Sequence, residues 1–256
     1  MLSACMKTKY LLRTRIGKNM VAEFLPPSRE SGKAIILCDG LPSMPHKKTL
    51  VNVLAGRGFW VFHLRYRGTW ESGGEFLRKS PAKDVIDAVA FLKKGRITDL
   101  YNGKIMRFRP KQIFVFGSSF GGATAICASV DKRIDAVVAI SPVADFCEIR
   151  GQDPRWLKEF VRVAFWGAYR SSALGWRKLI SGTLMNPQAI IHKLDKNKIF
   201  IIHSIDDEIV RYGPVKRFAR MLGCRLWSLK TQGHMSLNEI SRQKRLWREI
   251  AVFLRR

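Results

Sequence analysis

The sequence predicts an α/β protein built on a mostly parallel central sheet of about eight strands, with helices on both faces. Two observations lead to this prediction. Short apolar runs, typical of buried strands, alternate along the chain with longer segments of helical spacing. The chain also has 256 residues, 46% of them hydrophobic, which is enough for one large core. We therefore expect a single domain over residues 1–256.

The strands are predicted from runs of mainly apolar residues. Residues 10–12 and 20–24 open the chain and are expected to pair as a hairpin. Residues 34–38, Ala-Ile-Ile-Leu-Cys, form the continuous apolar run expected of a strand that is buried on both faces. The later strands are predicted at residues 59–64, 112–116, 134–140, 199–202 and 224–229.

The helices are predicted between these strands. Residues 81–95 place apolar side chains at positions 85, 86, 89 and 92, which is a helical spacing. Pro81 suits the first turn of that helix because its missing N–H would have no partner there. The other predicted helices cover residues 45–57, 120–130, 215–222 and 237–254.

Residues 145–185 interrupt this alternation, because they contain no strand pattern. An insertion at this point would lie over the carboxyl edge of the sheet, where open α/β sheets bind ligands. We expect a helical cap or lid. Its aromatic residues can equally form the cap's own core: Trp156, Phe160, Phe165, Trp166, Tyr169 and Trp176.

The chain is strongly basic, with 46 Lys and Arg against 20 Asp and Glu, a net charge of +26. Such a protein is attracted to anionic surfaces and substrates. The basic residues are spread along the chain, without a long basic tail or an aromatic-interleaved stripe, so no specific nucleic-acid binding is expected.

The five cysteines are scattered and form no C-x-x-C pair, which predicts a reducing, cytoplasmic setting. Residues 2–5, Leu-Ser-Ala-Cys, look like a lipoprotein cleavage site, but the charged and apolar regions that should precede it have no room. The sequence contains no run of about 18 apolar residues, so no transmembrane segment is predicted. No metal-binding or nucleotide-binding motif is present, so no cofactor is expected.

Residues 117–122, Gly-Ser-Ser-Phe-Gly-Gly, join the predicted strand at 112–116 to the helix at 120–130. A strand, a G-x-S-x-G sequence and a helix in this order make the nucleophile elbow of α/β hydrolases, in which a tight turn exposes the serine hydroxyl. The glycines let strand and helix approach without a Cβ clash. Ser119 lies midway between Gly117 and Gly121, so Ser119 rather than Ser118 is the predicted nucleophile.

A serine nucleophile needs a base, and the base needs an orienting carboxylate. In this fold the order along the chain is serine, acid, histidine. His234 is the predicted base, because it follows the strand at 224–229 and so lies at its carboxyl end. His203 would precede the acid, and two further histidines precede the serine: His46 and His63.

The acid is expected after the strand at 199–202, where three carboxylates compete: Asp206, Asp207 and Glu208. Residues 203–210, His-Ser-Ile-Asp-Asp-Glu-Ile-Val, resemble the H-G-x-x-D-x-x-V pattern of prolyl-oligopeptidase-like and dienelactone-hydrolase-like α/β hydrolases, with serine in place of the glycine. Residues 67–74, Arg-Gly-Thr-Trp-Glu-Ser-Gly-Gly, are similar to the R-G-x-x-x-S-G-G turn of the same hydrolases. The resemblance implies the α/β-hydrolase fold, with Asp207 as the acid and Asp206 as the alternative.

The oxyanion hole of such an enzyme needs two backbone N–H donors. One is expected from Phe120, the residue after the nucleophile, and the other from Leu41 in the loop after the strand at 34–38. Many relatives have His-Gly in this loop, where this chain has Asp39-Gly40. Because the donor is a backbone group, the change bears on the substrate class more than on the mechanism.

These motifs predict a serine hydrolase that cleaves ester, thioester or amide bonds through an acyl-enzyme, on a small-molecule or peptide substrate. An esterase or acyl hydrolase comes first and a small serine peptidase second, and the positive charge favours an anionic substrate. An acyltransferase is a further alternative. So is a non-catalytic scaffold for anionic partners, although serine, acid and histidine in the required order speak against it.

Overall fold

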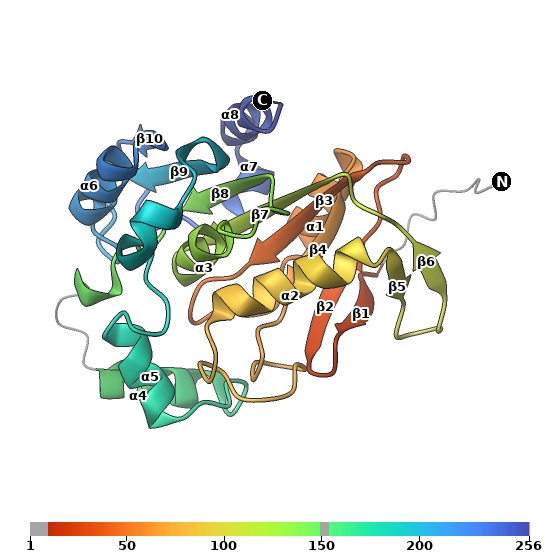
Figure 1. Ribbon diagram of the computed structural model, residues 1–256, viewed down its shortest axis with the longest axis horizontal. Coiled ribbons are helices and arrows are strands. Elements are labelled where there is room, and N and C mark those ends of the chain that lie inside the picture. The colour runs from red at the N-terminus through yellow and green to blue at the C-terminus, as the bar shows by residue number, and fades with distance from the viewer. Residues whose placement is uncertain (1–9, 149–153, 256) are drawn as a thin grey trace.

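A computed structural model describes residues 10–148 and 154–255, so the lipoprotein-like residues 2–5 lie outside the described part. The central sheet has eight strands in the order β1-β2-β4-β3-β7-β8-β9-β10 (Figure 1). Within the described sheet only β2 runs opposite to the other strands; it forms an opening hairpin with β1 and pairs with β4. The predicted fold class is thereby confirmed. The strands are β1 (Leu12–Ile16), β2 (Met20–Leu25), β3 (Lys33–Cys38), β4 (Trp60–Leu64), β7 (Gln112–Ser118), β8 (Ala136–Ile140), β9 (Ile199–Ser204) and β10 (Arg225–Leu229).

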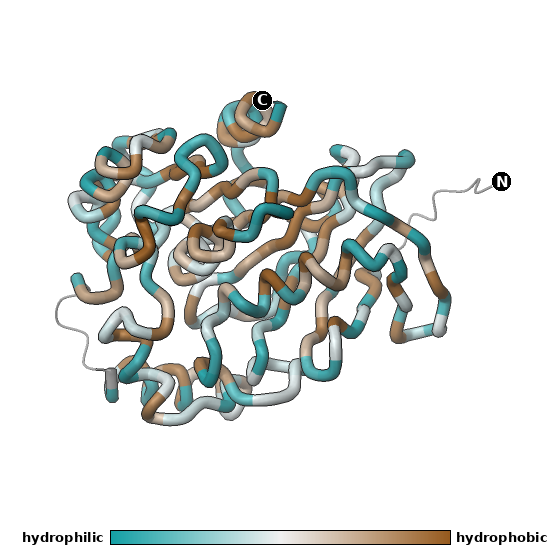
Figure 2. Tube along the Cα trace, in the orientation of Figure 1, coloured by the Kyte–Doolittle hydropathy of each residue, from teal (hydrophilic) through white to brown (hydrophobic). Residues whose placement is uncertain are grey.

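Side chains of the central strands alternate between two apolar cores, one on each face of the sheet. In β3, for example, Ile36 contributes to one core and Ile35 to the other. Figure 2 shows the hydrophobic residues gathered along these central strands. Strands buried on both faces must be apolar throughout, which is why continuous apolar runs predict them. One core is covered by α2 (Pro81–Lys93), α3 (Phe120–Ala128) and α6 (Tyr212–Leu222), and the other by α1 (Lys48–Gly56), α7 (Glu239–Arg242) and α8 (Lys244–Phe253).

The last helix was predicted as one element over residues 237–254, and the structure divides it into α7 and α8. Gln243 between them has extended backbone angles, φ −110° and ψ 106°. Ile240 and Leu246 are both fully buried in the same core. Six residues apart, they would point to different sides of a continuous helix with about 3.6 residues per turn. The break at Gln243 lets both face the sheet.

A second, two-stranded sheet was not predicted. It is a hairpin of β5 (Arg96–Thr98) and β6 (Ile105–Arg107), at the right of Figure 1. Its strands are short and partly basic, and only Ile97 among their residues is buried. Strands of this kind carry no apolar period that would identify them in a sequence.

The described part of residues 145–185 contains helices and no strand of the sheet. These are the short η1 (Phe146–Glu148), α4 (Pro154–Phe165) and α5 (Ala173–Ile180). The segment lies over the loops that follow β3 and β4 (Figure 1). The Tyr169 hydroxyl donates to the Ser43 carbonyl and accepts from the Ser43 N–H, at 3.1 and 3.0 Å. That residues 145–185 act as a cap, and that the chain is a single domain, both stay predictions.

α3 meets the sheet at very close range where β7 leads into it. A Cβ on Gly117 would overlap the Gly121 carbonyl, and one on Gly121 would overlap the carbonyls of Cys38 and Asp39. A Cβ on Gly122 would lie 2.7 Å from Pro142 Cβ. The glycines of the predicted elbow are therefore required by packing.

Among the described residues, no helix has both the length and the apolar character needed to cross a membrane.

We predict that Gly121→Ala destabilises the fold by more than about 3 kcal/mol, because the methyl group meets backbone atoms that cannot move independently. Gly213→Ala is the matched control: Gly213 lies in α6, and a Cβ there meets nothing within 4 Å. The control should unfold at the same urea concentration as the wild type or slightly higher. Equal midpoints for Gly121→Ala and the wild type would contradict the packing argument.

Candidate active site

Ser119 stands between β7 and α3 in a strained backbone conformation, with φ 55° and ψ −122°. This is a region that residues with a Cβ rarely adopt, and such strain is concentrated at functional sites. The Ser119 N–H donates to the Ile140 carbonyl at 2.9 Å, which ties the turn to the neighbouring strand β8. Ser118, the competing serine, is the last residue of β7 and is buried within the sheet. The turn therefore presents Ser119.

His234 and Asp207 come together at the carboxyl ends of β9 and β10. His234 Nδ1 lies 2.9 Å and 3.1 Å from the two carboxylate oxygens of Asp207. The Asp207 side chain is fully buried, whereas the His234 side chain is 25% exposed. A hydrogen on Nδ1 that is donated to Asp207 leaves the lone pair on Nε2, the nitrogen that can accept a proton.

The structure distinguishes Asp207 from the other two carboxylates. Asp206 is exposed, and its carboxylate accepts from the backbone N–H groups of Gln232 and Gly233, at 3.1 and 3.0 Å. Asp206 thus holds the loop that carries His234 without contacting the imidazole. Glu208 is exposed to solvent. Only Asp207 contacts the predicted base, as the sequence motif implies.

Asp207 has a second histidine partner that sequence reasoning did not identify. The buried His203 Nε2 lies 2.8 Å from the Val210 carbonyl and 3.3 Å from Asp207 Oδ2. The N–H groups of Ile209 and Val210 donate to Asp207 Oδ1 at 3.0 and 2.9 Å. Burial raises the pKa of Asp207, but the hydrogen bonds from His203, His234 and Val210 outweigh burial and hold the pKa well below its usual range. The carboxylate is therefore ionised at all but strongly acidic pH.

A buried serine links the loop of His234 to the strand beside Ser119. Ser141 follows β8, and its Oγ accepts from the Met235 N–H at 3.1 Å. The Ser141 N–H in turn donates to the Ile202 carbonyl of β9 at 2.8 Å. Ser119 is thus anchored at the end of β8 by its own N–H, and His234 by the N–H of the next residue, Met235. Among the described residues, no hydrogen bond joins Ser119 Oγ to His234.

The loop after β3 passes directly against Ser119. A Cβ on Gly40 would lie 3.3 Å from Ser119 Cβ and 3.9 Å from its Oγ. Within the described chain, neither the Leu41 N–H nor the Phe120 N–H donates to another group. The Phe120 ring is buried, with ring centroids of Tyr66 and Phe76 at 5.8 and 5.9 Å. Both predicted oxyanion donors thus belong to segments next to the serine.

Asp39, the first residue after β3, belongs to a buried charge network. Its carboxylate lies 2.6 Å from His63 Nε2 and 3.1 Å from Lys47 Nζ. His63 Nδ1 is 2.8 Å from Arg65, and Arg65 pairs with Glu23 at 2.7 Å. Burial alone would raise the pKa of Asp39. The interactions with His63 and Lys47 lower the pKa by more than burial raises it, so the pKa of Asp39 lies well below the usual range. The network anchors the loop that contains Leu41.

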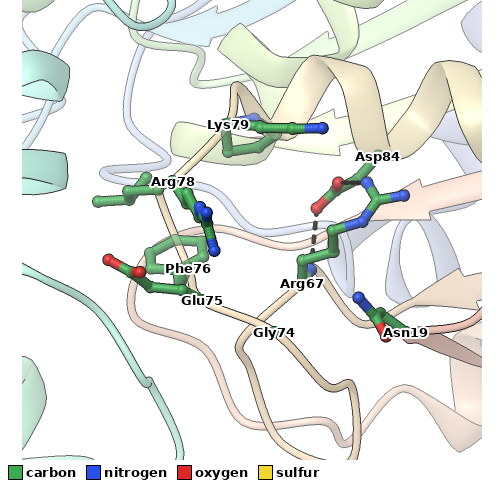
Figure 3. Close-up of a pocket in the computed structure, with 10 residues that line it drawn as sticks. Asn19, Arg67, Gly74, Glu75, Phe76, Arg78, Lys79 and Asp84 are labelled. Carbon is green, nitrogen blue, oxygen red and sulfur yellow. Dashed lines mark hydrogen bonds and ion pairs between the residues drawn. The ribbon is translucent and has the colours of Figure 1, made fainter.

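The Arg-Gly-x-x-x-Ser-Gly-Gly turn has a structural role on the side of this site that faces α2. Arg67 pairs with Asp84 and, at 2.7 Å, with Asp87 of α2. Arg67, Asp84 and Phe76 line a cavity of about 250 Å³. In Figure 3, Phe76 lies across this cavity from Arg67 and Asp84. Phe76 also contacts Phe120, so the turn supports the residue after the serine. Among the described residues, no group of three or more His, Cys, Asp or Glu side chains is placed to hold a metal ion.

Comparisons with known proteins agree with this architecture. The prolyl oligopeptidase family model matches residues 45–254. A search of curated proteins finds no match. The Pyrococcus furiosus esterase Pf2001 is 20% identical, with a TM-score of 0.68 over 96% of this chain and 90% of its own.

Two further solved structures have the same fold. Est1E from Butyrivibrio proteoclasticus, with ferulic acid bound, is 18% identical, with a TM-score of 0.65 over 94% of this chain and 99% of its own. An acylaminoacyl peptidase from Pyrococcus horikoshii is 14% identical, with a TM-score of 0.64 over 94% of this chain and 40% of its own.

We predict that Asp39→Asn destabilises the protein by about 3–5 kcal/mol at neutral pH, because it leaves the Lys47 ammonium buried without its counter-charge. A carboxylate with a depressed pKa stabilises the fold above its unfolded pKa near 4, and this contribution is lost as the pH falls through the folded value. The difference from wild type should therefore shrink below about pH 4.

Urea unfolding over a pH series measures this difference. The control is Asp195→Asn, because Asp195 is exposed and, within the described residues, its side chain accepts only from the Asn197 N–H. The control should change the free energy of unfolding by less than about 1 kcal/mol. A loss for Asp39→Asn no greater than that of the control would contradict the role of the network.

Proposed function

We propose that this chain, which belongs to the prolyl oligopeptidase family, is a serine hydrolase that acts through a Ser119–Asp207–His234 triad. The observation that carries the proposal is the Asp207–His234 pair, 2.9 Å apart, on the sheet edge where the strained turn presents Ser119. Serine, acid and histidine follow each other along the chain in the order that the α/β-hydrolase fold requires.

In the proposed reaction, Ser119 Oγ attacks the carbonyl carbon of the substrate while His234 Nε2 takes the hydroxyl proton. The buried Asp207 carboxylate keeps the imidazole in the right tautomer and stabilises its protonated form. The Phe120 and Leu41 N–H groups donate to the oxyanion of the tetrahedral intermediate. His234 then passes the proton to the leaving group, and water releases the acyl group by the same steps in reverse.

Esters are the proposed substrates, with amides of small peptides as the second candidate. The chain matches the esterase Pf2001 along 90% of that protein's length, but only 40% of the acylaminoacyl peptidase. One observation favours the peptidase alternative: the family to which the chain belongs is named after a peptidase, prolyl oligopeptidase. The net charge of +26 favours substrates with an anionic group.

We further propose a reducing, cytoplasmic setting. Cys38, Cys127, Cys147 and Cys224 are all free thiols in the described part of the chain. Cysteines of secreted proteins are usually paired. Cys5 lies outside the described residues.

We predict that Ser119→Ala and His234→Ala each lower kcat for p-nitrophenyl acetate at least about 10³-fold, and that the double variant is hardly slower than either. The two groups act as one unit, so removing the second costs little once the first is gone. Ser118→Ala is the matched control and should keep kcat within about tenfold of wild type. Full activity in Ser119→Ala would remove the proposed nucleophile.

A panel of p-nitrophenyl esters and aminoacyl p-nitroanilides separates the two substrate classes. For an esterase, kcat/KM should be at least about 100-fold higher for the best ester than for the best anilide. The kcat/KM for an ester with a carboxylate on its acyl chain should be higher than that for its neutral isostere. A higher kcat/KM for an anilide would replace the ester proposal by the peptidase alternative.

A further inference from the structure

Helix α4 and the residue directly after it expose four large apolar side chains to solvent. We call these four residues the aromatic face. Their exposed fractions are 56% for Trp156, 42% for Phe160, 61% for Val163 and 91% for Trp166. Single exposed apolar residues are common on protein surfaces, but a contiguous group indicates an interaction site.

Three residues of the aromatic face form a row on one side of α4, and Trp166 follows directly after the helix. Residues 156, 160 and 163 lie four and three positions apart, so they stand on the same side of the helix. The rings of Trp156 and Phe160 stack with centroids 5.4 Å apart and planes at 8°. The opposite side of α4 supplies the contacts with the rest of the protein: Val161 is buried, and Phe165 packs against Trp70 and Tyr169. The helix therefore presents apolar groups on two sides, only one of which is covered.

Basic residues accompany this face along the chain. Residues 154–185 hold six basic residues and one acidic residue, Glu159, which pairs with Arg162. An amphipathic helix that combines Trp and Phe with flanking Lys and Arg is typical of segments that lie in the headgroup layer of a membrane. The basic residues are Arg155, Lys158, Arg162, Arg170, Arg177 and Lys178.

The face lies on the same side of the molecule as the proposed active site. The hydroxyl of Tyr169, four residues after α4, bonds to Ser43 in the loop that carries Leu41. Met44 of the same loop is 64% exposed. Figure 1 shows α4 and α5 beyond the loops that follow β3 and β4. A surface that contacted the aromatic face would therefore lie on the side of the molecule where the loop after β3 passes Ser119.

We propose that the aromatic face docks the protein on an anionic lipid surface, with Trp156, Phe160, Val163 and Trp166 inserted among the headgroups. The accompanying Lys and Arg side chains then approach the lipid phosphates. The docking needs no catalysis, so it stands whether or not Ser119 is the nucleophile. A cytoplasmic leaflet carries the negative surface potential that this charge requires.

Charge and shape favour lipid over the other partners that an apolar face can bind. Two copies of a chain with net charge +26 repel each other, and each would bring further basic residues to the contact. Single-stranded nucleic acid stacks its bases on separate aromatic side chains in a groove. Here Trp156 and Phe160 are stacked on each other on an exposed helix, so no gap is left for a base.

Cosedimentation with large vesicles tests the proposal. At about 0.1 M salt, vesicles with about 30% phosphatidylglycerol in phosphatidylcholine should bind the protein at least about tenfold more strongly than phosphatidylcholine alone. Replacing all four residues of the aromatic face by serine should lower this binding at least about tenfold. Ser119→Ala should bind as the wild type does.

The matched control replaces Tyr101 and Ile105 by serine. These residues are 63% and 46% exposed and lie at the hairpin of β5 and β6, away from α4. The control should bind vesicles as the wild type does. Circular dichroism of each variant verifies that it is folded. We expect folded variants, because all the replaced side chains are exposed. In addition, brominated lipid should quench wild-type tryptophan fluorescence, and Trp156→Phe with Trp166→Phe should keep the binding while losing most of the quenching.

Four results would overturn the proposal. The first is equal binding to anionic and neutral vesicles, and the second is unchanged binding of the folded four-serine variant. The third is a stable dimer in sedimentation equilibrium that the four-serine variant dissociates, because the face would then be covered by a second copy. Binding to poly-uridylate that needs the same four residues, with no vesicle binding, would likewise assign the face to nucleic acid.

Discussion

The close approach of three backbones at Gly117, Gly121 and Gly122 is the constraint on which the site depends. The carbonyls at the end of β3 occupy the space where a Cβ of Gly121 would stand, and Gly121 in turn occupies the space next to Gly117. The chain between them has room only for a sharp turn, so Ser119 takes a positive φ. The same approach brings Gly40 against Ser119. The proposed nucleophile and the loop that carries the proposed oxyanion donor Leu41 are thus positioned by one packing contact.

Two buried carboxylates then fix what surrounds this contact. Asp207 is held by two histidines and two backbone N–H groups, and Asp39 by His63 and Lys47. Both pKa values lie below the usual range, although burial alone would raise them. Each carboxylate is therefore a fixed negative charge in a protein whose net charge is +26. One orients the proposed base, and the other anchors the loop that carries a proposed oxyanion donor.

Fully buried strands could be predicted because burial on both faces demands an unbroken apolar run. The run at 112–116 continues by two residues in the structure, because Gly117 and Ser118 still pair with β8 although neither favours a strand. The hairpin of β5 and β6 could not be predicted, since it has almost no apolar pattern. Ser119, Asp207 and His234 were accessible through their order and motifs. The charge network of Asp39 was not, because Glu23 and His63 come close to Asp39 only through the pairing of β2, β3 and β4.

Covalent labelling tests the central claim most directly, because it needs no knowledge of the substrate. A fluorophosphonate reacts only with a serine that a neighbouring base activates. Peptide mass spectrometry of the labelled wild-type protein should find one phosphonylated residue, Ser119, and labelling should be lost when His234 is replaced by alanine. A folded wild-type protein that remains unlabelled, or a label on Ser118 or Ser141, would contradict the account.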